Sequence, residues 1–273
     1  MKEKYIPFLF LLPALLYVAY FSFYPTASAV YQSFQTPHAH FVLSNYKGLL
    51  YFGLSEAILN TLFLSAGALA IQFAVAFVVS SVLIREFRGK SVFTALFVIP
   101  FGVATVVAGF SFSNIFATTG GYANSLLRIF GLPPLNWYSS WGMDMLTIMV
   151  SDSWKNTPIV ALILLAGMTS ISPEIYKAAA LDGAGPLRRF IHITLPNLKG
   201  YIAIALVIRG VSEFNIFALP LILVGYRPVF LTTMTYEFYS TTASVYYSYA
   251  AATVLLAFVL AFSLLVIKMR ENH

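Results

Sequence analysis

Six apolar runs, each long enough to cross a lipid bilayer, follow one another along this 273-residue chain. About 30 Å of hydrocarbon is crossed by roughly 20 helical residues. The runs lie near Tyr5–Tyr24, Leu62–Ile84, Val92–Phe116, Met145–Met168, Tyr201–Val224 and Ala250–Met269. Because lipid offers no hydrogen-bond partner, the backbone of each run must satisfy its own polar groups, as a helix does. We therefore predict an all-α membrane protein with six transmembrane helices, forming a single domain over residues 1–273.

The composition excludes an ordinary soluble domain. Hydrophobic residues make up 59% of the chain and charged residues 10%, against roughly 45–50% and about 25% in soluble proteins. The chain has no cysteine, which excludes disulfides, thiol chemistry and cysteine-ligated metals. The net charge of +6 does not predict nucleic-acid binding, because no basic face carries interleaved exposed aromatic residues.

The basic residues predict the orientation in the membrane. Only Lys47, Arg128 and Arg227 would lie on one side. The other side would hold Lys2, Lys4, Arg85, Arg88, Lys90, Lys177, Arg188, Arg189, Lys199, Lys268 and Arg270. Cytoplasmic segments carry the excess of Lys and Arg. We therefore predict a multi-pass protein of the plasma membrane with both termini in the cytoplasm.

The first apolar run has a second interpretation as a signal peptide. Lys2 and Lys4 precede it, and Ala27-Ser28-Ala29 resembles a cleavage site. Its apolar stretch exceeds the usual 7–15 residues, however, and Tyr24-Pro25 interrupts the approach to that site. We therefore expect the run to remain as a membrane span.

A polar segment of the chain, Glu174–Pro196, separates the fourth and fifth apolar runs. Ser172 and Pro173 are typical of a helix start, as N-cap and first helical residue. Asp182-Gly183 predicts a turn, and Pro186 can open a second helix that ends at Leu195-Pro196. The sequence thus predicts a cytoplasmic helix–turn–helix over residues 172–197, which we call the polar loop.

The polar loop resembles the EAA motif of ABC importer permeases. The likeness rests on Ala178-Ala179, Asp182-Gly183-Ala184, Phe190, Ile193 and Leu195-Pro196. From Trp154 to Pro196 the chain is most similar to the sugar and glycerol-phosphate branch of that family. A looser likeness includes Leu11-Leu12-Pro13-Ala14, Tyr24-Pro25 and Asn60-Thr61. The chain departs from the motif at Lys177, where the family usually has a glutamate that forms ion pairs with the ATPase.

The resemblance implies a permease that forms half of a pore and does not itself hydrolyse ATP. Its partners would be a second related permease subunit, a dimer of ATP-binding subunits and an extracytoplasmic solute-binding protein, besides membrane lipid. No cofactor would bind to this chain, since ATP and Mg²⁺ would sit on the ATPase. Contact with the ATPase would come from the coupling residues Glu174, Lys177, Ala178, Ala179, Asp182, Gly183, Leu187, Phe190, Leu195 and Pro196, and from Leu181. Asp182 would either cap the second helix or accept from a basic group on the ATPase.

Charged residues inside two apolar runs predict either internal ion pairs or a substrate path. Each costs roughly 2.5–3.5 kcal/mol near a helix centre when unpaired. Asp152 and Lys155 are three residues apart, and Arg209 and Glu213 four apart, so each pair can close on one helix face. The alternative is a polar cavity for sugar hydroxyls. Its candidate residues are Asp152, Trp154, Lys155, Asn156, Glu213, Phe214 and Asn215.

Other functions have less support in the sequence. Arg88-Gly89-Lys90-Ser91 lacks the earlier glycine of a phosphate-binding loop, since Ile84 stands there. His38 and His40 are too few for a metal site, and no nucleophile–base set indicates an enzyme.

The tyrosines between residues 236 and 249 are typical of an interfacial belt or of a docking surface for a binding protein. An ion-driven secondary transporter would also explain Asp152 and Glu213, but not the polar loop. The substrate would be a di- or oligosaccharide or, second, glycerol phosphate.

Overall fold

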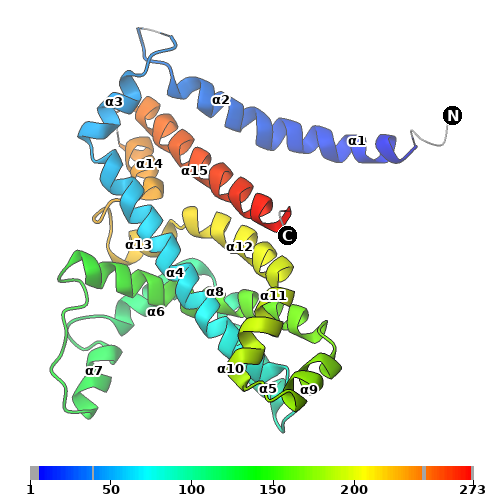
Figure 1. The fold of residues 1–273 in the computed structure, drawn as a ribbon. Coiled ribbons are helices and arrows are strands. Elements are labelled where there is room, and N and C mark those ends of the chain that lie inside the picture. Colours follow the sequence, from blue (N-terminus) through cyan, green and yellow to red (C-terminus); the bar gives the residue numbers. More distant parts are fainter. Residues whose placement is uncertain (1–5, 39, 242–243, 272–273) are drawn as a thin grey trace.

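The computed structural model describes residues 6–38, 40–241 and 244–271, and every regular element in these ranges is helical (Figure 1). Lys2, Lys4 and the start of the first predicted span at Tyr5 lie outside the described residues. Three helical stretches are long and apolar enough to cross a membrane, and three bent helix pairs bring the number to six when each pair is counted as one span. The all-α membrane fold predicted from the sequence is confirmed.

The N-terminal arm is one continuous helical rod, which lies beside α15 along its second half and extends beyond the rest of the molecule at its first half (Figure 1). It consists of α1 (Ile6–Val18), η2 (Ala19–Phe23) and α2 (Tyr24–Ser33). The prediction that the first span ends at Tyr24 is therefore wrong. Pro25 cannot donate the next helical hydrogen bond, and the π-helical turn η2 directly before it lets the rod continue without a break.

The core of the subunit is built on the long helices α4 (Leu54–Leu83) and α8 (Trp141–Thr169), which pack along each other. The helix α12 (Lys199–Phe214) packs on both, and α15 (Val245–Glu271) packs on α12 and α2. Where α12 meets α15, Gly210 lies against the ring of Phe262, and a Cβ there would collide with that ring. The small residue lets the two helices approach closely.

Two of the predicted spans are broken rather than straight. The third consists of α5 (Lys90–Gly102) and α6 (Thr105–Ile115), which meet at 99°. The fifth stops at Phe214 and resumes as the short helix α13 (Ala218–Leu223). Because α13 packs on α6 and α8, these half-length pieces fill the core at the end of α8 opposite the polar loop.

The predicted external segments contain short helices of their own. These are α3 (Ser44–Tyr51), α7 (Tyr122–Ile129) and α14 (Leu231–Ser240). The second span therefore begins at Leu54 instead of Leu62, and the last begins at Val245 instead of Ala250. Buried Asn60 donates to the Val229 carbonyl (2.9 Å) and accepts from the Trp141 indole (2.8 Å), so it joins α4 to the loop before α14 and to the start of α8.

Candidate functional site

The polar loop forms two helical arms, as the sequence predicts. The first arm is α9 (Pro173–Leu181), and the second is the run α10 (Pro186–Arg189), η3 (Phe190–Thr194) and α11 (Leu195–Asn197). The Ser172 hydroxyl accepts from the Glu174 N–H (3.3 Å), so the predicted N-cap is confirmed. Gly183 has φ +73°, a conformation that costs other residues about 1–2 kcal/mol. The turn between the arms therefore depends on this glycine.

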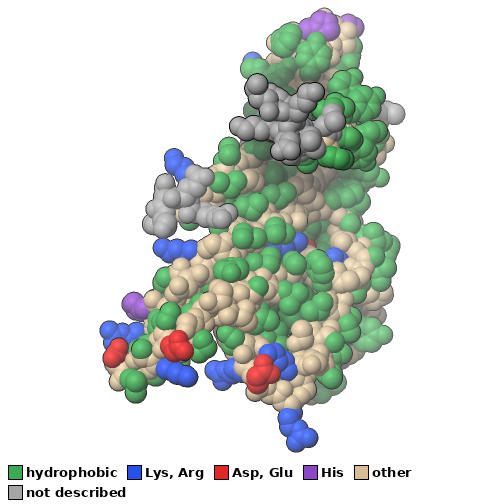
Figure 2. Space-filling model, turned by 90° about the vertical axis from the view of Figure 1, so that its right-hand side faces the viewer, with side chains coloured by type: hydrophobic (Ala, Val, Ile, Leu, Met, Phe, Trp, Pro, Cys, Tyr) green, Lys and Arg blue, Asp and Glu red, His purple; other side chains and the backbone are tan. Residues whose placement is uncertain are grey.

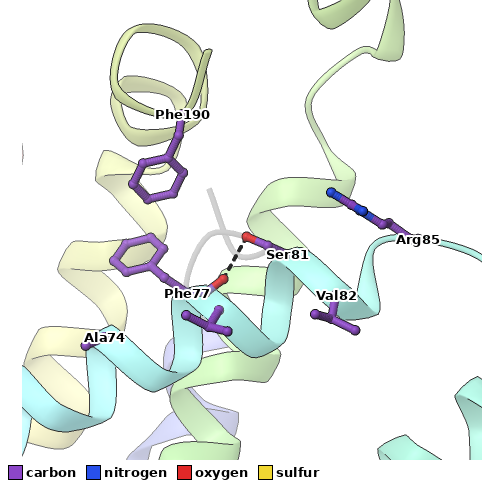
Figure 3. A pocket seen from close by; sticks show the side chains of 7 residues that line it. Ala74, Phe77, Ser81, Val82, Arg85 and Phe190 are labelled. Carbon is purple, nitrogen blue, oxygen red and sulfur yellow. Dashed lines mark hydrogen bonds between the residues drawn. The ribbon is translucent and has the colours of Figure 1, made fainter. Parts of the chain in front are cut away.

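The two arms are tied to each other and to the membrane core. The Tyr176 hydroxyl lies 2.9 Å from that of Thr194, which joins α9 to η3. The Phe190 ring meets the Phe77 ring of α4 edge to face, with centroids 5.5 Å apart, and both line an open groove of about 570 Å³ that Arg85 borders (Figure 3). In this conformation the Phe190 ring holds the loop against the second span, and a contact of Phe190 with the ATPase stays a prediction.

The ends of the two arms expose large apolar side chains. Leu181, the last residue of α9, is 90% exposed, and Leu187 at the start of the second arm is 71% exposed. Both lie beside the turn at Gly183. Figure 2 views the molecule from the right-hand side of Figure 1, where α9 lies, and Lys and Arg side chains are spread over the lower half of this face. An apolar tip within a charged surface is typical of a protein interface.

Asp182 does not cap the second arm. It is the C-cap residue of α9, and the N-cap of α10 is Gly185, without a side-chain hydrogen bond. The Asp182 side chain is exposed, as is that of Lys177. The capping role predicted for Asp182 is therefore wrong, and its contact with a basic group on the ATPase stays a prediction.

Three of the four charges inside these spans, all but Lys155, meet with an amide in one buried group, which we call the polar cluster: Gln72, Asp152, Arg209 and Glu213. Arg209 bonds to Glu213 and lies 3.4 Å from the Asp152 carboxylate. Gln72 donates to Asp152 (2.9 Å) and to Glu213 (2.7 Å), and it accepts from Arg209 Nε (3.2 Å). The cluster thus joins α4, α8 and α12 through partners that offset part of the cost of burying the charges, and the Glu213 Oε2 atom is buried without a hydrogen-bond partner among the described residues.

The predicted pair between Asp152 and Lys155 is wrong, whereas the pair between Arg209 and Glu213 is confirmed. The Lys155 ammonium lies over the Phe101 ring, 5.8 Å from its centroid. The Asp152 carboxylate instead accepts from Asn156 (2.8 Å) as well as from the cluster. A spacing of three residues on α8 would have allowed Asp152 to pair with Lys155. Asp152 bonds instead to Gln72 of α4 and Arg209 of α12.

The candidate residues for a substrate path separate into two groups. Asp152, Asn156, Glu213 and Phe214 are buried within the subunit in this conformation. Trp154 is 45% exposed, Asn215 is exposed, and Lys155 is half-buried. Only this second group can touch a solute without rearrangement, and a substrate path through either group stays a prediction.

Sequence reasoning missed Gln72 and Phe77. Gln72 could have been found as a lone amide within an apolar span, because a polar group there is costly unless it has a partner. A phenylalanine in such a span carries no comparable signal. Within the ranges that the structure describes, no three His, Asp or Glu side chains gather as metal ligands.

Comparison with known proteins decides the family. The model of the family described as binding-protein-dependent transport system inner membrane component matches residues 72–270. This chain belongs to that family. The matched region of the permease begins at Gln72 and includes the polar loop and the rest of the polar cluster.

Individual relatives agree with this assignment. The trehalose/maltose transport system permease protein MalF of Thermococcus litoralis is 30% identical over 196 residues, which cover 70% of this chain and 65% of that protein. The probable ABC transporter permease protein YurN of Bacillus subtilis is 30% identical over 282 residues, covering 98% and 96%. A bacterial ABC transporter involved in the import of the acidic polysaccharide alginate shares the fold, with a TM-score of 0.80 at 20% identity, covering 99% of this chain and 96% of that one.

Proposed function

We propose that this permease is half of the pore of an ATP-driven sugar importer, and that the polar loop couples it to a separate ATPase. The observation that carries this proposal is the tip formed by Leu181 and Leu187. Side chains of this size are each worth about 1.5–3 kcal/mol when buried. No described element of the chain covers them, and the surrounding charges suit a water-soluble partner.

Movement of the ATPase would reach the pore through the contacts of the second arm. Phe190 presses on Phe77 of α4, and the arm continues into α12 through a bend of 68°. The helix α12 carries Arg209 and Glu213, which bond to α4 and α8. A shift of the loop would therefore move α4, α8 and α12 together and change access to the path beside Trp154 and Asn215.

The orientation and the partners belong to the same proposal. The polar loop and both termini face the cytoplasm, in line with the distribution of Lys and Arg. The N-terminal arm exposes Phe10, Leu15, Tyr17, Phe21 and Phe23, so lipid and a second permease subunit have a broad apolar surface to cover. A neighbouring structure is an alginate ABC transporter in complex with a periplasmic protein bound to an alginate pentasaccharide, and an extracytoplasmic binding protein is accordingly expected above this pore.

A di- or oligosaccharide is the favoured substrate. Relatives named for trehalose/maltose and arabinooligosaccharides support it, and one named for sn-glycerol-3-phosphate supports the second candidate. Arg209 is engaged by two carboxylates and is not free to hold a phosphate. The exposed ring of Trp154 and amide of Asn215 suit sugar faces and hydroxyls.

A mild-detergent pull-down of the tagged chain, with ATPase activity assayed on the co-purifying proteins, tests the proposal. We expect an ATP-hydrolysing subunit and a second permease in the complex. A chain that purifies alone and transports solute in vesicles under an ion gradient without ATP would contradict it and favour a secondary transporter that uses Asp152 or Glu213.

A further inference from the structure

An open cavity lies at the end of α6, where the chain turns into α7. Its volume is about 720 Å³, within the range of roughly 300–1,000 Å³ that small-molecule sites occupy. We call it the α6–α7 cavity. Its walls include Ser111, Asn114 and Ile115 of α6, Thr119 of the connecting turn and Tyr122 of α7.

The α6–α7 cavity lies at the end of the molecule opposite the polar loop. Phe116, which follows α6, packs in one core cluster with Met145 near the start of α8. From there α8 runs 29 residues in all to Thr169, or about 44 Å, before the polar loop begins. Figure 1 likewise shows α6 and α7 far from α9 and α10. The cavity and the polar loop are thus on opposite sides of the membrane.

The walls of the cavity offer hydrogen-bonding groups and carry no charge. Ser111 and Asn114 each donate to a backbone carbonyl of α6, at 2.8 Å and 2.9 Å, and their side-chain oxygens remain able to accept. Thr119 is exposed, and its hydroxyl bonds to no described residue. The hydroxyls of a solute can pair with these groups, whereas an ionic solute finds no counter-charge in the walls.

An aromatic ring completes the cavity. Tyr122 is the first residue of α7 and is 73% exposed. A tyrosine presents a flat apolar face beside a polar hydroxyl, and the C–H face of a sugar ring packs on such a surface. A free ring beside uncharged hydroxyl and amide groups favours an uncharged sugar as the ligand.

The turn that holds these groups is braced from behind by Asn124. This buried side chain donates to the carbonyls of Thr118 (3.0 Å) and Leu135 (2.9 Å). Its amide oxygen accepts from the Leu135 N–H (2.9 Å) and the Trp137 indole (3.0 Å). The turn and the start of α7 are therefore fixed before a ligand arrives, which lowers the entropic cost of binding.

The cavity also adjoins the candidate substrate path. Phe112 follows Ser111 on α6, and its ring meets the Trp154 ring edge to face, with centroids 5.4 Å apart. Trp154 belongs to the candidate path residues that a solute can touch without rearrangement. The wall of the cavity and the contact with Trp154 are thus neighbours on α6.

We infer that the α6–α7 cavity is an entry subsite for an uncharged di- or oligosaccharide, outside the membrane-embedded path. The Tyr122 ring packs on one sugar face, and Asn114 and Thr119 bind hydroxyls. The inference rests on the proposed function, because it names the place where the sugar first meets the permease. Its position on the external side rests on the proposed orientation.

Saturation-transfer NMR on the permease complex in lipid nanodiscs, without a binding protein, tests the subsite. Nanodiscs avoid detergents with sugar headgroups. The probes are maltose, trehalose and arabinotriose, and sn-glycerol 3-phosphate is the charged control. The variants are Tyr122→Ala, Tyr122→Phe and Asn114→Leu. Tyr51→Ala is the matched control, because Tyr51 is a 92% exposed tyrosine at the end of α3. Trp154→Ala reports on the path.

We expect Tyr122→Ala to weaken sugar binding about fivefold and Asn114→Leu about threefold. Tyr122→Phe keeps the ring and should keep most of the affinity, and Tyr51→Ala should behave like the unmodified complex. The phosphate probe should give no signal that depends on Tyr122. Unchanged binding of all three sugars in Tyr122→Ala, or no binding of any of them to the unmodified complex, would overturn the subsite. A loss confined to Trp154→Ala would also overturn it, by moving the sugar to the path.

ATP-driven sugar uptake by the unmodified complex, measured in parallel, separates this inference from the proposed function. Uptake without binding that depends on Tyr122 would remove the subsite and leave the importer. Binding that depends on Tyr122 without ATP-driven sugar uptake would contradict the importer, and the cavity would then be a sugar site but not an entry to a pore.

Discussion

The polar loop and the polar cluster of this permease both place charged residues between apolar helices, but they differ in what holds them. The loop is defined by neighbours in sequence: Ser172 caps its first helix and Gly183 makes its turn. The cluster joins Gln72, Asp152 and Arg209 from three different helices. The loop exposes its side chains, whereas Glu213 in the cluster has no exposed surface. The exposed region suits binding to a partner, and the buried one suits holding helices together.

Removal of the cation from the polar cluster should have the largest effect. Arg209→Met would leave Asp152 and Glu213 buried close together without a counter-charge. Breaking a buried pair in this way costs about 3–5 kcal/mol, and we expect a clearly lower Tm in detergent. Lys155→Met is the control, since the Lys155 ammonium lies over the Phe101 ring and has no ion pair among the described residues, so its loss should cost about 0.5–1 kcal/mol. Equal loss of Tm in the two variants would contradict the separation of Lys155 from the cluster.

A charge on the apolar tip of the polar loop should weaken assembly and leave the fold intact. In Leu187→Asp, the binding to the ATPase would lose the burial of one large side chain, about 1.5–3 kcal/mol, or roughly tenfold to a hundredfold in affinity. The Tm of the isolated chain should not change, because Leu187 is already 71% exposed. Leu126→Asp on α7, where the leucine is 56% exposed, provides the control in the same affinity measurement. Unaltered affinity of Leu187→Asp would mean that the tip is not the interface.

A β-branched residue at the turn of the loop should uncouple transport from ATP hydrolysis. Gly183→Val puts a side chain where φ is +73°, at a cost of about 1–2 kcal/mol, and the strain changes how the two arms are held. Sugar uptake per ATP hydrolysed should fall severalfold while membrane insertion persists. Gly120→Val carries the same strain, with φ also +73°, in the loop before α7, and should keep normal coupling. Normal uptake in Gly183→Val would remove this glycine from the mechanism.

Substitution of Lys177 should change the affinity for the ATPase less than any of the other variants. This exposed residue stands at the position of the glutamate in the EAA motif that the polar loop resembles, and Lys177→Glu reverses a surface charge at the proposed interface. Exposed ion pairs contribute about 0–1 kcal/mol. We therefore expect the affinity for the cognate ATPase to fall by no more than about fivefold at low salt, and the difference to disappear at 1 M salt because the charges are screened. A change that persists at high salt would argue for a steric role.

The sequence predicts the polar loop well because its signals are local. The cap at Ser172 and the turn at Gly183 depend on residues within a few positions of each other, so no tertiary information was required. The same holds for the existence of the long apolar helices. The break between α5 and α6 had a signal in Pro100 and Gly102, but the length of the run favoured a single span.

The polar cluster was only half predictable, for a physical reason. Arg209 and Glu213 lie one helical turn apart and pair within α12. Asp152 could have paired with Lys155 on its own helix, but it bonds to Gln72 and Arg209, which are distant in sequence. The packing of α4 and α12 on α8 brings these donors to Asp152, and the spacing of residues along one helix does not predict that packing. Likewise, the continuation of the N-terminal rod through Pro25 depends on the π-helical turn before it.

Cross-linking from the tip of the polar loop is the most direct test of the proposed coupling. The chain contains no cysteine, so Leu187→Cys carries a single site for a thiol-reactive photo-cross-linker, and Leu126→Cys is its matched control. In the assembled complex, we predict an adduct between residue 187 and the ATP-hydrolysing subunit, and none from residue 126. An assembled and active complex in which residue 187 yields no such adduct would contradict coupling through this loop.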